Sequence, residues 1–271
     1  MYKMRIKITI CIFFFITVLN AQIKMLSWNL ENFGKSKSDV ALLYIANTVK
    51  DYDVVAIQEV VAGEGGAQAV ARLADELNRK GSMWDYTISN PTTGSPNKSE
   101  RYAYLWKTAR VSLIGKAWLE KRYQLEMDRE PFLAKFSFEG KEVTLVTFHA
   151  ITKAKKPENE LRYFKDMIVE YPTLNLVFMG DFNCPQSNTV FKLIRTMGYE
   201  SAFRGQKTSL KRECKKGECL ASEFDNIWYK KGIVSIKNSK SIPFFTSFKD
   251  LKSARTVSDH IPVTTELYLN K

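Results

Sequence analysis

The chain has 271 residues, of which 45% are hydrophobic and 26% are charged. This is the composition of a globular protein, and it excludes a disordered tail or a collagen-like fibre. Lys and Arg number 41 against 29 Asp and Glu, so the formal net charge is +12, and the chain has just two histidines.

The first residues have the three-part layout of a secretory signal peptide. Three basic residues precede an apolar run over 8–19, and Ala21 is a small residue suited to cleavage. A membrane anchor is the alternative, but the uncharged stretch over 8–23 has 16 residues, fewer than the roughly 20 of a spanning helix. We therefore predict a signal peptide at 1–21, one domain at 22–271, a secreted or periplasmic protein, and no stable membrane insertion after cleavage.

The remaining chain mixes strand and helix patterns. Short apolar or alternating runs predict strands, and apolar residues at helical spacing predict helices. In chain order we predict a strand at 23–28, a helix at 39–49, a strand at 53–57, a helix at 67–80, strands at 86–89, 102–106, 111–118, 132–138 and 143–148, a helix at 157–170, a strand at 174–179, a helix at 190–197, and strands at 227–229, 233–236 and 262–269.

The basic, polar segment 204–222 predicts a long surface loop. The mixed order of elements, with many hairpins, favours two packed sheets flanked by helices over one parallel sheet. No linker divides the chain, which is why one domain is expected.

Three cysteines remain after the predicted cleavage, and export implies oxidising surroundings. Cys214 and Cys219 are five residues apart and could close a small disulfide loop. Cys184 would then remain as an odd cysteine. Zinc binding is the alternative, although no histidine lies near these cysteines.

Polar residues gather where apolar runs end or begin. Six segments place a carboxylate, an amide or an imidazole beside a strand, and they contain both histidines: 27–31, 57–60, 147–149, 179–183, 223–227 and 258–262. If these strands share one sheet edge, the polar groups meet in one cleft. Oxygen ligands suit Mg²⁺, imidazoles transfer protons near neutral pH, and arginine holds phosphate.

Each segment taken alone also has a purely structural interpretation. The run Gly-Asp-Phe-Asn is often an Asx turn, a Gln-Glu pair at a strand end is usually solvated, and His149 could be a core histidine. The conjunction of all six segments favours a catalytic metal site.

Four of these motifs, in this order, resemble the endonuclease/exonuclease/phosphatase superfamily, and within it the pancreatic-type deoxyribonucleases. They are Ser-Trp-Asn-Leu-Glu-Asn-Phe at 27–33, Ile-Gln-Glu-Val at 57–60, Gly-Asp-Phe-Asn at 180–183 and Ser-Asp-His-Ile-Pro-Val at 258–263. Segments 98–102 and 129–136 are also similar to those nucleases, so the resemblance spans 23–267. It implies a four-layer α/β sandwich of two packed mixed sheets flanked by helices.

The resemblance also implies a role for each site residue. His149 and His260 would be the acid/base pair. Glu100 would orient His149, and Asp225 would pair with the other side of the site. Asp181 and Asn183 would align the attacking water and a phosphate oxygen. The implied metal ligands are Glu59, as the principal one, with Asn29, Asp259 and Glu31. The implied phosphate contacts are Arg129, Asn183 and Asn29. The implied cofactor is Mg²⁺ with Mn²⁺ as a substitute, whereas Ca²⁺ stays open because 208–220 has no clear counterpart of the nuclease calcium loop.

We therefore expect a secreted, monomeric, Mg²⁺-dependent phosphodiesterase that hydrolyses DNA without sequence specificity, by metal-assisted attack of water. The basic segments 153–156 and 204–222 suit a polyanion, although a merely solubilising surface is the alternative. A sphingomyelinase-like or small-ester phosphoesterase is the second hypothesis, with 242–245 as a membrane hairpin or as core. A non-enzymatic binding module is the third. The resemblance further suggests a Cys184–Cys219 disulfide, which competes with Cys214–Cys219.

Overall fold

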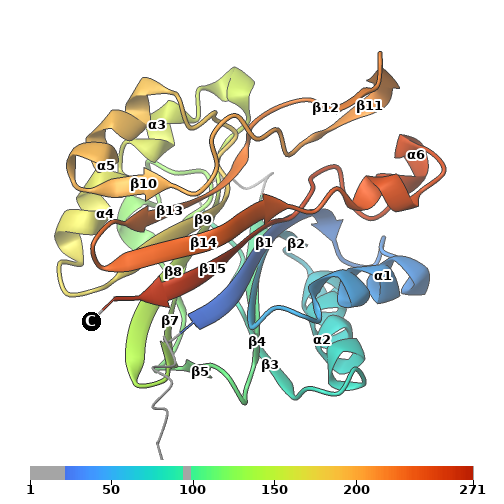
Figure 1. The fold of residues 1–271 in the computed structure, drawn as a ribbon, viewed down its shortest axis with the longest axis horizontal. Helices are drawn as coiled ribbons and strands as arrows, with labels where there is room; N and C mark the ends of the chain where they lie inside the picture. Colours follow the sequence, from blue (N-terminus) through green and yellow to red (C-terminus); the bar gives the residue numbers. More distant parts are fainter. Residues whose placement is uncertain (1–21, 94–98, 271) are drawn as a thin grey trace, which may run out of the picture.

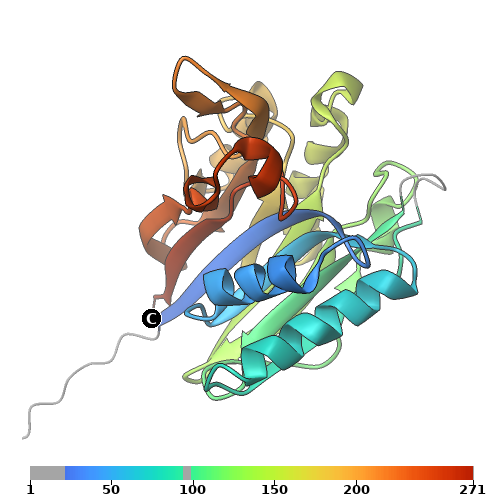
Figure 2. The same cartoon turned by 90° about the vertical axis from the view of Figure 1, so that its right-hand side faces the viewer.

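The computed structural model describes residues 22–93 and 99–270, so the predicted signal peptide at 1–21 lies outside the described residues. In this part of the chain two mixed β-sheets pack face to face, and helices cover their outer faces (Figures 1 and 2). The predicted α/β sandwich is thereby confirmed.

The first sheet contains the chain's first strand and its last. β1 pairs parallel with β2 and antiparallel with β15. In spatial order this sheet consists of β14 (Val234–Ser241), β15 (Val263–Leu269), β1 (Gln22–Phe33), β2 (Val54–Val61), β4 (Glu100–Lys107) and β3 (Trp84–Ile88).

The second sheet is built around the parallel pair β8 and β9. β7 and β8 form the hairpin that Glu139-Gly140 predicts, because both residues adopt the positive φ of a tight hairpin turn. In spatial order this sheet consists of β10 (Tyr199–Ser201), β13 (Asp225–Lys230), β9 (Leu176–Asp181), β8 (Lys141–His149), β7 (Phe132–Phe138) and β5 (Ser112–Leu113), with β6 (Trp118–Leu119) also paired to β7.

The main core lies between the two sheets. Alternate residues of a strand face opposite ways, so in β4 the rings of Tyr102 and Tyr104 enter this inter-sheet core while Leu105 faces the helices. Because helices cover the other face, the central strands are apolar on both sides. This double burial explains why their sequences read as continuous apolar runs.

The helices form the two outer layers. α1 begins at the N-cap Ser38, whose side chain accepts a hydrogen bond from the Ala41 backbone N–H. Figure 2 shows α1 and α2 side by side across the first sheet. α6 packs into the same helix-side core, whereas α3, α4 and α5 pack on the second sheet. Their bounds are α1 (Asp39–Val49), α2 (Glu64–Asn78), α3 (Glu158–Leu161), α4 (Phe164–Glu170), α5 (Lys192–Thr196) and α6 (Leu251–Ala254), with 3₁₀ turns at Lys121–Tyr123, Lys153–Lys155, Thr189–Phe191 and Phe244–Ser247.

Some predicted elements need correction. The predicted helix 157–170 is two short helices, and the predicted strand 111–118 is β5 followed by an irregular link to β6. α2 starts at Glu64, earlier than predicted. Gly65 and Gly66 lie in its first turn, and glycine has a low helix propensity, so the sequence does not predict helix there. A Cβ on Gly66 would lie 2.0 Å from the Val61 carbonyl oxygen, so this close approach requires glycine.

The predicted loop 204–222 is also wrong, since it contains the antiparallel hairpin β11 (Leu210–Lys215) and β12 (Glu218–Leu220). Its tip is Lys216-Gly217, both at positive φ. The disulfide joins Cys214 to Cys219 across the two strands, and Cys184 is a free, buried thiol. The alternative Cys184–Cys219 pairing and the zinc alternative are therefore overturned.

The segment 242–245 belongs to the core. Phe244 is 3% exposed and packs against Trp28, and Ile242 and Phe245 pack against the same apolar cluster. None of the helices in the described ranges has the length and apolarity needed to span a bilayer.

Candidate active site

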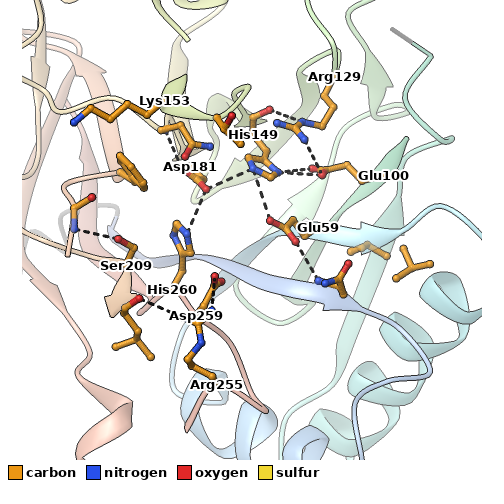
Figure 3. Close-up of a pocket in the computed structure, with 18 of the residues that line it drawn as sticks. Glu59, Glu100, Arg129, His149, Lys153, Asp181, Ser209, Arg255, Asp259 and His260 are labelled. Atoms are coloured by element: carbon orange, nitrogen blue, oxygen red, sulfur yellow. Dashed lines mark hydrogen bonds and ion pairs between the residues drawn. The ribbon is translucent and has the colours of Figure 1, made fainter. Parts of the chain in front are cut away.

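Strand ends from both sheets meet at one rim of the sandwich and line a cleft (Figure 3). β8 and β9 are parallel neighbours, so His149 lies opposite Asp181 at their carboxyl ends. β13 runs antiparallel to β9 and therefore begins with Asp225 opposite Asp181. In the first sheet β4 begins with Glu100 near the end of β2. The topology thus brings carboxylates and imidazoles to one place.

Asp181 is the centre of this arrangement. Its Oδ2 lies 3.5 Å from His149 Nε2 and 3.6 Å from His260 Nε2, and both rings point toward it in Figure 3. The carboxylate is 1% exposed. Burial alone would raise the pKa of Asp181, but the two imidazoles outweigh that effect and lower it. Asp181 is therefore an ionised group between two proton carriers.

Asp181 can reach this position because of the residue before it. Gly180 has φ +136°, and a Cβ there would lie 2.1 Å from the Phe148 carbonyl oxygen. Glycine therefore allows β9 to approach β8 closely just before the carboxylate. The Asn183 backbone N–H then donates to Asp181 Oδ1 at 2.9 Å, an Asx turn that fixes the carboxylate.

His149 is held by a carboxylate and an arginine. Its Nδ1 lies 3.0 Å from both carboxylate oxygens of Glu100. Burial would lower the pKa of His149, but the charge and hydrogen bond of Glu100, together with the charge of Asp181, outweigh burial and raise it. Arg129 is 6% exposed, donates through Nε to the His149 carbonyl at 2.8 Å, and lies 3.6 Å from Glu100. The ring nitrogen Nε2 is thereby directed at the cleft.

His260 has an equivalent support from the other side of the cleft. Its Nδ1 lies 2.7 Å from Asp225 Oδ2. Burial would lower the pKa of His260, but the carboxylates of Asp225 and Asp181 raise it well above its ordinary value. Thr208 donates to the same Asp225 oxygen at 2.6 Å. The imidazole is thus a buried, oriented and protonated group.

Glu59 faces His149 from the first sheet. It lies in a β-bulge of β2 with φ +59°, and its Oε1 is 3.7 Å from His149 Nε2. Asn29 donates from Nδ2 to Glu59 at 3.0 Å and to Asp181 at 3.1 Å. A non-glycine residue at positive φ costs on the order of 1–3 kcal/mol and is typical of functional sites. Glu31, Asn32 and Asn183 share this feature.

Beside Glu59 the structure gathers two further carboxylates. Burial raises the pKa of Glu31, and the charges of Asp259 and Glu59 raise it further. Arg255 lies 3.3 Å from Asp259 and relieves part of this repulsion. A cluster of carboxylate oxygens that repel each other is the donor set of a hard divalent cation. Glu59, Glu31 and Asp259 supply oxygen donors of the kind that such an ion takes, but their donor atoms do not all lie within 4.8 Å of one another, as those of Asp181, Asp225 and His260 do.

A second group could also hold a metal. Donor atoms of Asp181, Asp225 and His260 lie within 4.8 Å of one another, and all three residues are buried. In this structure His260 and Asp225 already satisfy each other through a hydrogen bond.

Some of the predicted site residues already use their polar groups in hydrogen bonds within the protein. Asn29 presents its amide nitrogen to Glu59 because its Oδ1 accepts from the Glu31 backbone N–H at 3.0 Å. Asn183 Nδ2 donates to the Ala150 carbonyl at 3.0 Å, and Arg129 also donates to that carbonyl. Arg129 and Asn183 line the cleft nevertheless.

Several side chains that support the site have no recognisable signal in the sequence. Thr208 links the segment before β11 to Asp225, and a lone threonine has no pattern that could reveal this. Ser258 donates to the Asn29 carbonyl at 2.6 Å and accepts from the His260 backbone N–H. Gln58 donates to Ser27 and to Thr147, which ties the two sheets together behind the cleft. Ser258 and Gln58 lie inside the quoted motifs but had no assigned role.

A model of the endonuclease/exonuclease/phosphatase family matches residues 26–260. The chain therefore belongs to this family.

Among individual proteins, the chain is 27% identical over 266 residues to a deoxyribonuclease of Thioalkalivibrio sp. (strain K90mix), covering 90% of this chain and 70% of that protein. It is 29% identical over 177 residues to bovine deoxyribonuclease-1, covering 61% of this chain and 62% of that protein.

Solved structures share the fold. The human Nocturnin catalytic domain is 14% identical with a TM-score of 0.64 and covers 93% of this chain and 96% of that one. A family protein from Bacteroides thetaiotaomicron is 17% identical with a TM-score of 0.65 and covers 93% and 99%.

Proposed function

We propose that this protein is a divalent-metal-dependent phosphodiesterase that hydrolyses DNA without sequence specificity. One observation carries the proposal: two imidazoles, each backed by its own buried carboxylate, face Asp181 beside a cluster of carboxylates. The similarity to proteins named deoxyribonuclease supports DNA as the substrate.

The metal is assigned to the carboxylate cluster. Glu59 would be the principal ligand, with Asp259 and Glu31 close by, and the ion is Mg²⁺ or its substitute Mn²⁺. When bound, such an ion neutralises phosphate charge and polarises a phosphoryl oxygen. Asn29 would serve less as a ligand than as a donor, because its amide N–H groups hold Glu59 and Asp181 in place and lie where a phosphate oxygen could accept from them.

The proton transfers are assigned to the two histidines. One imidazole Nε2 removes a proton from the attacking water, and the other gives a proton to the leaving oxygen. Glu100 and Asp225 keep each Nδ1 protonated and so keep each Nε2 directed into the cleft. Asp181 and Asn183 would position the water and a phosphate oxygen. Arg129 supports the site by holding the His149 and Ala150 carbonyls, and it would attract the phosphate through its charge.

We favour DNA over a lipid headgroup as the substrate, because the predicted membrane hairpin is buried and the protein is positively charged. The segment 242–245, predicted as a possible membrane hairpin, packs in the core. Basic residues exceed acidic ones by 12 in the whole chain and by 9 without the predicted signal peptide, an excess that suits a polyanion. The Cys214–Cys219 disulfide is typical of an oxidising compartment and supports export. We further propose that the protein acts outside the cytoplasm, as a monomer.

A plasmid nicking assay tests the proposal. We expect relaxation of supercoiled plasmid with Mg²⁺ and none after complete chelation with EDTA. Glu59→Gln should raise the Mg²⁺ concentration needed for half-maximal activity, whereas Glu64→Gln, an exposed acid at the start of α2, should not. Parallel reactions with single-stranded DNA, RNA and sphingomyelin vesicles compare the substrates. Choline-phosphate release without nicking, or nicking that survives chelation, would reject the proposal.

A further inference from the structure

A second charged recess adjoins the catalytic cleft. It lies between the β11–β12 hairpin and α6, and we call it the hairpin–α6 groove. Figure 1 shows the hairpin reaching beyond the sheets, with α6 beside it. Its cationic lining consists of Arg212, Lys249, Lys252 and Arg255, against the two carboxylates Glu213 and Asp250.

The groove is continuous with the cleft. Arg212 and Arg255 line both recesses. Arg255 also donates to the Leu210 carbonyl at 3.1 Å, which fastens the helix to the base of the hairpin. A chain that leaves the cleft on this side must therefore pass the groove.

Most of the groove's positive charge has no internal partner. Arg255 pairs with Asp259, but no carboxylate among the described residues lies within 4.0 Å of the side-chain nitrogens of Arg212, Lys249 or Lys252. These three side chains are exposed. Unpaired cations beside a phosphate-cleaving site offer contacts to further phosphates.

The chemistry of the groove selects a nucleic acid backbone rather than a membrane or stacked bases. The described part of the hairpin and of α6 exposes no large apolar side chain, so it has nothing to insert into a bilayer. The sequence 207–222 contains no aromatic residue that could stack on a base. Contacts there would be to phosphates and independent of sequence.

We propose that the hairpin–α6 groove binds the phosphodiester backbone of the DNA strand beyond the scissile bond. This inference rests on the proposed function and adds an extended substrate site to it. The disulfide holds the two hairpin strands together at the level of the groove, because Cys214 itself lines it.

The test compares two variants that remove the same charge. The groove variant is Arg212→Ala/Lys249→Ala/Lys252→Ala. The control variant is Lys50→Ala/Lys116→Ala/Lys192→Ala, three exposed lysines that line neither recess. Fluorescence anisotropy in EDTA would give the Kd for a labelled 20-base-pair duplex at several NaCl concentrations, and thermal unfolding would verify that both variants fold.

We expect the groove variant to bind at least about tenfold more weakly at low salt, and to lower the slope of log Kd against log salt by about 2–3. The control should change the slope by less than about 1. In addition, Glu213→Gln should tighten binding by a few-fold, a gain that misfolding cannot produce. Equal effects of the groove and control variants would overturn the inference while leaving the proposed function intact.

Two further arms separate the remaining outcomes. If the unmodified protein fails to nick plasmid in Mg²⁺, the proposed function fails, and the inference fails with it. If the groove variant loses binding to phosphatidylserine vesicles but binds the duplex normally, the groove is a lipid surface and the inference is wrong. If the groove variant loses duplex binding while the control variant nicks plasmid as the unmodified protein does, the inference is supported.

Discussion

The cleft and the hairpin–α6 groove are both charged, but they hold their charges in opposite ways. In the cleft, His149, His260 and Asp181 are buried, and each has a partner at hydrogen-bond distance or nearly so. In the groove, Arg212 and the two lysines are exposed and unpaired. Bond cleavage requires groups held within about 0.5 Å of their working positions. Backbone binding acts through charge over longer distances and tolerates mobile side chains.

Removing a cleft residue should lower the rate of DNA cleavage strongly while changing the affinity for DNA little. His149→Ala should lower kcat on DNA by about 10²–10⁴-fold, the usual contribution of a general acid or base. The Kd for the duplex in EDTA should change much less than in the groove variant. Single-turnover nicking and anisotropy measure the two quantities. An unchanged kcat would remove His149 from the mechanism.

The buried pairs of the cleft should also contribute stability that depends on pH. The folded pKa of His260 lies well above 6.5 because of Asp225 and Asp181. The stability that this raised pKa contributes is therefore fully present below about pH 6.5 and is lost as pH rises through the folded pKa. Burial raises the pKa of Asp225 as well, so the ion pair itself is also lost at low pH, where this carboxylate is protonated. Asp225→Asn should destabilise the fold by about 3 kcal/mol at pH 6, because one partner of a buried pair is removed.

The destabilisation by Asp225→Asn should shrink as the pH is raised toward 9, which urea unfolding at several pH values would measure. The matched control is Lys249→Ala in the groove, which should stay within about 0.5 kcal/mol of the unmodified protein throughout. A loss of stability that is the same at every pH would show that the Asp225–His260 pair is not the cause.

A smaller effect on the fold than that of Asp225→Asn is expected when the hairpin disulfide is removed. Cys214→Ser/Cys219→Ser opens a loop of six residues, for which the chain-entropy model gives at most about 2 kcal/mol. DNA affinity should weaken, because the groove's β11 side is no longer held, whereas kcat should fall far less than with His149→Ala. Thermal unfolding and anisotropy measure both. A loss of kcat as large as that of His149→Ala would show that the hairpin organises the cleft itself.

Several elements could be predicted closely because their patterns are local. The helix Asp39–Val49 and the strand Phe132–Phe138 have the bounds that the sequence predicts. Each is predicted by its local apolar pattern. In the structure the Ser38 cap also marks the start of the helix, and the Glu139-Gly140 turn follows the end of the strand. The β11–β12 hairpin was missed because its strands are mostly charged and exposed, and because its turn places a lysine at positive φ.

From the sequence alone, candidate residues for the chemistry could be named, because chemistry restricts residue types and each motif is a short contiguous run. The structure gathers those six segments at one rim, through the parallel pairs β1–β2 and β8–β9 and through the antiparallel strands β13 and β15, which begin there. Only the tertiary structure decided which other side chains support these candidate site residues. Thr208 reaches Asp225 across 17 residues, Gln58 reaches Thr147 across 89, and Arg255 reaches Leu210 across 45. Such contacts join residues whose spacing along the chain has no period, so only the packed sheets bring them within hydrogen-bond distance.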